Sequence, residues 1–289
     1  MSVRPLLIFG RNGQLARAIA RSLRARGQDF RALGSQDCDL VESVEACAAH
    51  IRGVSAVINA SAFTAVDAAE TRAHANRQLN THAPGAMATA CAKQGIPFVH
   101  VSTDYVFDGD ASAPWRPDAP TAPLNAYGRA KAAGERAVRA AGGTALILRT
   151  SWVHDGAGRN FVTTMMGLKD KPTLRVVDDQ MGRPTQAGHL AEAIIKATDH
   201  GWQGVQTHHV QDSGHPLSWA DFAEAIFKRR PGPGPRIERI PSRDYPTPAA
   251  RPAWSVLDTS GFETTFAHPM PPWQDGLDLS LWEMEREAR

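Results

Sequence analysis

The sequence predicts an α/β protein in which helices cover both faces of a parallel β-sheet. Over the first half of the chain, short apolar segments typical of strands alternate with longer segments typical of helices. The strand segments are apolar almost without interruption, as expected for parallel strands buried on both faces. The length of 289 residues is sufficient for one large α/β domain with a smaller second lobe.

The elements predicted for the first half follow one another in a regular order. The first strand, 6–9, passes through a turn containing Gly10 and Gly13 into a helix that Gly27 ends. The later strands are 30–33, 56–60, 98–101 and 145–148, and helices separate them at 41–51, at 83–94 and around Tyr127. Together these segments predict a Rossmann-like, doubly wound parallel sheet.

The second half of the chain has a less regular pattern. Helices are predicted at 160–168, 188–198 and 219–227, short strands at 174–177 and 207–210, and proline-rich loops at 231–235 and 241–252. We therefore predict a dinucleotide-binding domain over residues 1–153, to which later segments can return. Residues 154–289 are predicted to form mainly a smaller substrate-binding lobe over the carboxyl edge of the sheet.

Composition excludes several classes of protein. The formal net charge is +2, and acidic and basic residues alternate along the chain, which argues against a nucleic-acid-binding protein. The three cysteines have no metal-binding spacing and are odd in number, so neither a zinc site nor a disulfide framework is predicted. No apolar run approaches the length of a membrane span, and we expect a cytoplasmic protein that has no membrane partner.

The turn after the first strand is typical of a dinucleotide-binding site. Gly10 and Gly13 follow a strand and precede a helix, so backbone N–H groups can approach a pyrophosphate at the helix N-terminus. The second strand ends at 33–36 without the carboxylate that NAD-selective sites use. Arg11 can instead face a ribose 2′-phosphate, so NADPH is favoured and NADH remains an alternative. Arg11 can equally be an ordinary loop cation.

Three polar residues suit the reduction of a carbonyl group. Tyr127 and Lys131 are four residues apart, so a helix places both on one face, although this spacing alone also fits an exposed helix surface. The Lys131 ammonium group is expected to lower the pKa of the Tyr127 phenol toward neutrality. Thr103 follows the strand 98–101 at the edge where open sheets bind ligands. Its hydroxyl can polarise a carbonyl while a nicotinamide supplies hydride and Tyr127 supplies the proton.

On these residues the chain resembles the short-chain dehydrogenase/reductase superfamily, in its extended branch that acts on nucleotide sugars. The likeness is strongest to the dTDP-4-dehydrorhamnose reductases and extends over nearly the whole chain. Seven segments carry it, in the order expected for that family: 10–15, 59–67, 102–107, 127–131, 149–153, 179–185 and 245–252. Seven ordered segments are much more specific than any single one of them.

The resemblance implies an NADPH-dependent reductase that converts dTDP-4-dehydro-L-rhamnose into dTDP-L-rhamnose. It implies that Tyr127 donates the proton, that Lys131 holds the nicotinamide ribose, and that Thr103 polarises the C4 carbonyl. The cofactor-contact positions are Gly10, Arg11, Asn12, Gly13, Gln14, Leu15, Asp39, Leu40, Ala62, Phe63, Thr64, Tyr127 and Lys131. The substrate-contact positions are Thr103, Asp104 and Trp152. Trp152 can also be an ordinary core residue, and Asp39 an ordinary turn residue.

Some positions depart from the family pattern. Ala16, His154 and Ala250 stand where Gly, Tyr and Arg are common, which affects fine substrate contacts more than the reaction. Some relatives bind magnesium, but no carboxylate cluster is assembled for it here, and we predict no metal. Asp104 is followed by Tyr105, so a dehydratase would lack its second carboxylate.

Several alternatives stay open. They are an epimerase or reductase for another nucleotide sugar and a regulatory NADP-binding relative without catalysis. We predict a nucleotide-sugar substrate as the small-molecule partner, and either a monomer or a homodimer.

Overall fold

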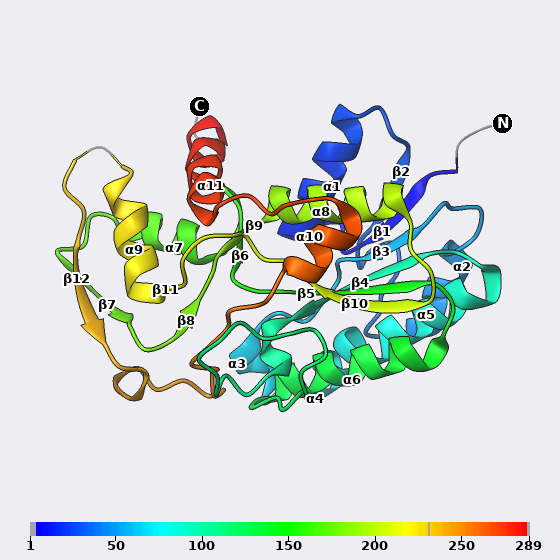
Figure 1. Cartoon of the computed structure of the whole chain (residues 1–289), viewed down its shortest axis with the longest axis horizontal. Helices are drawn as coiled ribbons and strands as arrows, with labels where there is room; N and C mark the ends of the chain where they lie inside the picture. Colours follow the sequence, from blue (N-terminus) through cyan, green and yellow to red (C-terminus); the bar gives the residue numbers. More distant parts are fainter. Residues whose placement is uncertain (1–3, 231, 288–289) are drawn as a thin grey trace.

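A computed structural model describes residues 4–230 and 232–287 and places a smaller lobe beside a main parallel sheet (Figure 1). Within these residues the main sheet has six strands, and every pair of neighbours is parallel. In order across the sheet they are β2 (Phe30–Leu33), β1 (Leu6–Phe9), β3 (Val57–Asn59), β4 (Phe98–Thr103), β5 (Ala145–Thr150) and β10 (Val205–His209). The chain leaves β1 for β2 on one side and returns to β3 on the other, so the ligand-binding switch point lies at their carboxyl ends. The predicted fold class is confirmed.

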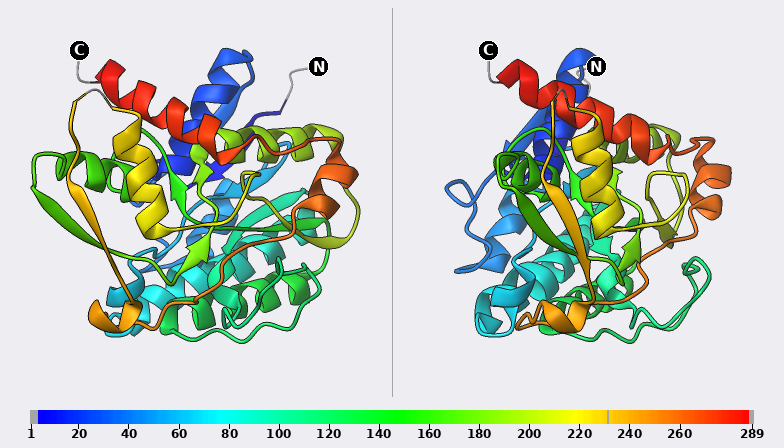
Figure 2. Two further views of the ribbon diagram at one scale, coloured as in Figure 1. Left: turned by 60° about the vertical axis from the view of Figure 1, so that its left-hand side comes forward. Right: turned by 90° about the vertical axis from the view of Figure 1, so that its left-hand side faces the viewer.

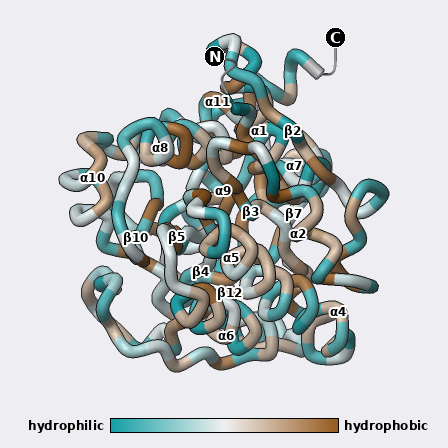
Figure 3. Tube along the Cα trace, turned by 90° about the vertical axis from the view of Figure 1, so that its right-hand side faces the viewer, coloured by the Kyte–Doolittle hydropathy of each residue, from teal (hydrophilic) through white to brown (hydrophobic). Residues whose placement is uncertain are grey.

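Helices cover both faces of the main sheet because its strands alternate their side chains between two cores. Leu6 and Ile8 of β1 belong to one core, and Leu7 and Phe9 belong to the other. The first core is covered by α1 (Gln14–Ala25), α8 (Ala187–His200) and α10 (Ser260–Phe266). The second is covered by α2 (Cys47–His50), α5 (Ala83–Gln94) and α6 (Ala126–Ala141). Figure 2 shows these two layers from two further directions, and Figure 3 shows hydrophobic stretches alternating with hydrophilic ones along the chain.

The connections near the carboxyl edge contain several short helices. They are η1 (Val44–Ala46), α3 (Val66–Ala69), α4 (Ala73–Arg77), the π-helical turn η2 (Gln78–His82) and η3 (Asp104–Val106). The helix predicted at 41–51 is shorter than expected, because η1 and α2 begin only at Val44. The Asp39 carboxylate accepts the N–H groups of Val41 and Glu42, and this Asx-type turn occupies the residues before it.

The smaller lobe packs its helices around a separate apolar cluster. Its helical elements are α7 (Phe161–Gly167), α9 (Trp219–Lys228), η4 (Ser242–Asp244) and α11 (Trp273–Glu287). Its strands form three pairs: β6 (Val153–His154) with β9 (Thr185–Gln186), β7 (Thr173–Val177) with β12 (Arg236–Ile240), and β8 (Met181–Gly182) with β11 (Leu217–Ser218). Residue 231 of the predicted loop 231–235 lies outside the described residues.

Two segments from the second half of the chain lie in the main sheet or against it. Strand β10 pairs with β5, and α8 packs beside α1 on one face of the sheet. Strand β12 and helices α10 and α11 were not predicted from the sequence. The domain boundary near residue 153 stays a prediction.

Candidate active site

The glycine turn packs closely against the end of β3. Gly10 has a φ of +101°, and a Cβ atom there would lie 2.8 Å from the backbone of Ala60 and Ser61. Gly13 precedes α1 and has no side chain to cap the first N–H groups of that helix. Those N–H groups have no partner within the helix. They therefore suit a phosphate group, and the turn fits the pyrophosphate of a dinucleotide.

One cavity of about 750 Å³ joins this turn to the carboxyl ends of β4 and β5. It brings together most of the residues selected from the sequence: Gly10, Asn12, Gly13, Gln14, Leu15, Asp39, Leu40, Ala62, Thr64, Thr103, Asp104, Tyr127, Lys131 and Trp152. Arg11 and Phe63 are outside its lining. Phe63 is buried against Tyr127, and Asn80 of η2 holds its backbone at both N–H and C=O. Phe63 thus supports the cavity wall instead of facing a ligand.

The residues predicted for carbonyl reduction meet at one end of the cavity. Thr103 ends β4, while Tyr127 and Lys131 lie on α6. The Asn125 side chain caps α6 by accepting the Gly128 N–H at 2.8 Å, which places Tyr127 in the first helical turn. A Cβ atom at Gly128 would lie 2.2 Å from the Tyr105 carbonyl oxygen, so glycine there lets α6 approach η3.

Burial dominates the electrostatics of this group. Burial raises the pKa of Tyr127, and the neighbouring Thr103 hydroxyl only partly opposes that change. The expectation that Lys131 lowers this pKa is wrong for the free protein, because desolvation of the phenol outweighs any attraction from the cation. Burial also lowers the pKa of Lys131 to about 8, against the attraction of Glu135. The Lys131 Nζ atom donates to the Val101 carbonyl oxygen at 2.6 Å.

A buried ion pair lies beneath Lys131. Arg149 of β5 donates to both carboxylate oxygens of Glu135, at 2.9 and 2.7 Å, and Ser102 donates to the same carboxylate at 2.6 Å. Glu135 and Arg149 are each 2% exposed. Glu135 follows Lys131 by one helical turn, so this pair fixes α6 on the sheet where the lysine projects into the cavity. Neither residue was predicted from the sequence to belong to the site, although Arg149 begins the segment 149–153.

The loop that follows β2 carries a carboxylate that sequence analysis missed. Asp37 folds back and accepts the Gly34 N–H at 2.8 Å, and Arg11 forms an ion pair with it at 2.8 Å. These contacts, led by the Gly34 hydrogen bond, hold the pKa of Asp37 below its usual value. Arg11 is therefore engaged by an acidic residue at the position where it was expected to face a ribose phosphate. The loop conformation, which the sequence does not reveal, brings the two together.

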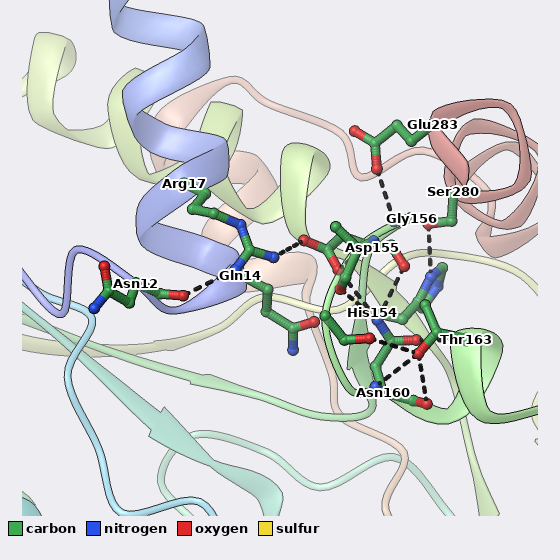
Figure 4. Close-up of polar contacts among 12 residues, drawn as sticks. Asn12, Gln14, Arg17, His154, Asp155, Gly156, Asn160, Thr163, Ser280 and Glu283 are labelled. Carbon is green, nitrogen blue, oxygen red and sulfur yellow. Dashed lines mark hydrogen bonds and ion pairs between the residues drawn. The ribbon is translucent and has the colours of Figure 1, made fainter. Parts of the chain in front are cut away.

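The segment that follows Trp152 is fixed to two helices (Figure 4). Arg17 of α1 pairs with buried Asp155 at 2.9 Å, and Gln14 donates to the Val153 carbonyl oxygen at 2.9 Å. On the other side, Ser280 and Glu283 of α11 bond to His154 and to the Gly156 N–H, each at 2.9 Å. This segment is thereby held between α1 and α11.

Trp152 has an unusual backbone conformation. Its φ is +47°, and its ring stacks on Trp219 with centroids 3.4 Å apart and planes 10° from parallel. Trp219 begins α9 of the smaller lobe, so this stack forms part of the boundary between lobe and cavity.

Comparison with known proteins identifies the family. The family model described as RmlD substrate binding domain matches residues 4–286. The chain belongs to the RmlD family. Among its RmlD relatives, the dTDP-4-dehydrorhamnose reductase of Burkholderia thailandensis is 38% identical over an alignment of 296 residues, and this alignment covers 96% of this chain and 98% of that protein.

Two further comparisons concern the substrate and the cofactor of RmlD-like proteins. A probable dTDP-4,6-dihydroxy-2-methyloxan-3-one 4-ketoreductase of Streptomyces antibioticus is 38% identical and covers 94% of this chain and 92% of its own length. The crystal structure of dTDP-4-dehydrorhamnose reductase from Bacillus anthracis in complex with NADP has a TM-score of 0.90 and 30% identity. The structural match covers 98% of this chain and 100% of the Bacillus anthracis chain.

This RmlD-family protein has neither a metal-binding cluster nor a membrane-spanning helix among the residues that the structure describes. Within residues 4–230 and 232–287, no three His, Cys, Asp or Glu side chains gather closely enough to hold a metal ion. In the same part of the chain, no helix is both long and apolar enough to span a bilayer.

Proposed function

We propose that this protein is an NADPH-dependent reductase that converts dTDP-4-dehydro-L-rhamnose into dTDP-L-rhamnose by reducing the C4 keto group. The observation that carries the proposal is the placement of Thr103, Tyr127 and Lys131 in the same cavity as the glycine turn. NADPH bound in that cavity supplies hydride to the carbonyl carbon. Family membership and the named relatives support the choice of substrate.

The chain's own residues perform the remaining steps. The N–H groups that follow Gly13 hold the pyrophosphate, and Lys131 holds the nicotinamide ribose. The Tyr127 hydroxyl hydrogen-bonds the C4 oxygen and transfers its proton to the alkoxide as that charge develops. When its hydrogen turns toward the cavity, the Thr103 hydroxyl provides a second donor at the same oxygen, and burial of the group strengthens both interactions.

A substrate panel tests this function. We expect the purified protein to consume NADPH when dTDP-4-dehydro-L-rhamnose is added, with dTDP-L-rhamnose identified by NMR. Other dTDP keto sugars serve as the comparison, because the Streptomyces antibioticus relative is named for a different one. NADPH binding without turnover of any of these sugars would instead indicate a non-catalytic relative. A C4 or C5 epimer formed without net NADPH consumption would indicate an epimerase.

The Arg11–Asp37 pair provides a prediction about the cofactor. Replacing Asp37 by Asn keeps an acceptor for the Gly34 N–H but releases Arg11 and removes a negative charge. We expect the KM for NADPH to fall several-fold in Asp37→Asn and to rise about tenfold in Arg11→Ala, as for a partly exposed charge-assisted hydrogen bond. Steady-state kinetics with both cofactors measures this, and the KM for NADH should not fall in Asp37→Asn. Equal changes for NADPH and NADH would show that the pair does not contact the 2′-phosphate.

A further inference from the structure

Asp104 has an environment that a simple substrate contact does not explain. It is 3% exposed, and both of its carboxylate oxygens are engaged by protein hydroxyl groups. The Thr103 Oγ1 atom donates to one oxygen at 2.9 Å, and the Ser255 Oγ atom donates to the other at 2.5 Å. Ser255 comes from a distant part of the chain, so this contact joins the end of β4 to the segment that precedes α10.

The single hydrogen of the Thr103 hydroxyl group limits what this residue can donate to. A threonine hydroxyl has one hydrogen, and here that hydrogen is directed at Asp104. The same oxygen already accepts the Tyr105 N–H at 3.2 Å. While Asp104 is ionised, Thr103 therefore has no hydrogen to offer a carbonyl oxygen in the cavity, and Tyr127 is left as the donor.

Protonation of Asp104 reverses the direction of this contact. A protonated carboxyl group donates one hydrogen bond, so it can donate to the Thr103 oxygen instead of accepting from it. The Thr103 hydrogen is then free to turn toward the cavity. We propose that Asp104 is a positioning residue whose protonation state determines whether Thr103 donates to the keto oxygen, and that reduction is fastest with Asp104 protonated. This inference rests on the proposed reductase function.

The surroundings of Asp104 support a change of protonation in an accessible range. Burial raises the pKa of Asp104 to about 6, against the hydrogen bonds from Ser255 and Thr103. The titratable groups nearest to it are the Tyr105 and Tyr127 phenols, and burial raises the pKa of each, so both stay neutral.

The other charged groups around Asp104 are Arg251, Asp67 and Lys131. Beyond Tyr105, Arg251 and Asp67 form a two-contact ion pair and offset each other. Lys131 lies in the same cavity, but burial lowers its pKa only to about 8, so it titrates at a higher pH than Asp104.

The proposal predicts a specific pH profile. For the wild type, kcat/KM should fall about tenfold per pH unit above the pKa of Asp104, down to a plateau about a hundredfold lower, as for the loss of one oxyanion donor. Asp104→Asn imitates the protonated acid, because its amide N–H donates to Thr103 and its oxygen accepts from Ser255. We expect this variant to lack the fall near pH 6 and to exceed the wild-type activity at about pH 8.

Two more variants separate positioning from structural support. Ser255→Ala removes a donor to the carboxylate, which destabilises the charged form, so the fall in activity should move to higher pH. Thr103→Ala should be about a hundredfold less active and should show no fall of kcat/KM near pH 6, because it has no hydroxyl group that could reorient toward the keto oxygen. NADPH binding, measured by fluorescence, checks that each variant folds.

Two results would overturn the proposal. One is an Asp104→Asn enzyme that binds NADPH but is slowed about a hundredfold at every pH, which would make Asp104 a direct participant. The other is the absence, in infrared difference spectra between about pH 5 and about pH 8, of a protonated carboxyl band that disappears in Asp104→Asn. The spectra are recorded without substrate, so they test Asp104 even if the wild type fails to reduce the proposed sugar.

Discussion

Replacing Tyr127 by Phe is expected to lower kcat about a thousandfold while leaving NADPH affinity nearly unchanged. The phenol is the proton donor in the proposed reaction, and phenylalanine keeps the ring that packs against Phe63 and against Tyr105. Only the hydroxyl group is lost, so the cavity should keep its shape. Stopped-flow measurement of hydride transfer, together with NADPH titration, separates the chemical step from cofactor binding.

Tyr105 offers a matched control for this substitution. Its phenol lies in the same cavity, with its ring centroid 5.6 Å from that of Tyr127 and the two rings nearly perpendicular. Tyr105→Phe removes a hydroxyl of the same kind but is expected to change kcat less than about tenfold, because it is not the proton donor. A Tyr127→Phe enzyme as active as Tyr105→Phe would contradict the proposed role of Tyr127.

The parts of the site that sequence analysis predicted depend on local chemistry. Gly10 and Gly13 mark the turn because a strand precedes them and a helix follows. The strands of the main sheet could be predicted because parallel strands buried on both faces are continuously apolar. Each of these signals lies within a few residues of the feature that it predicts.

The parts that sequence analysis missed depend on contacts between distant residues. Ser255 hydrogen-bonds to Asp104, which lies 151 positions away in the chain, and no local sequence pattern predicts that contact. Asp37 lies only four residues beyond β2, but its role follows from a loop that folds back onto Gly34. The pKa of Tyr127 was mispredicted for a related reason. The spacing to Lys131 is visible in the sequence, whereas the burial that dominates the pKa is a property of the whole fold.

Replacing Arg149 by Met is expected to destabilise the protein by about 3–5 kcal/mol at neutral pH, because it leaves Glu135 charged, buried and without its main partner. Arg139→Met is the matched control. Arg139 also contacts Glu135, at 3.4 Å, but its side chain is 40% exposed, and its loss should change stability by no more than about 1 kcal/mol. The double variant Glu135→Leu with Arg149→Met should recover most of the loss, since no unpaired charge remains. Urea denaturation measures all three free energies of unfolding.

The pH dependence of these free energies shows whether Arg149→Met destabilises the protein through an unpaired buried charge or through a packing defect. In the wild type, burial raises the pKa of Glu135, but the bonds from Arg149 and Ser102 outweigh burial and leave it lowered. The contribution of Glu135 is therefore present above its unfolded pKa and lost as the pH falls through its folded pKa. Without Arg149, burial dominates and the folded pKa lies above the unfolded value, so the variant regains stability as the pH falls from neutral toward about 5. The difference between the two proteins should shrink over that range, whereas a difference that stayed constant would assign the loss to packing around Phe107 and Pro117.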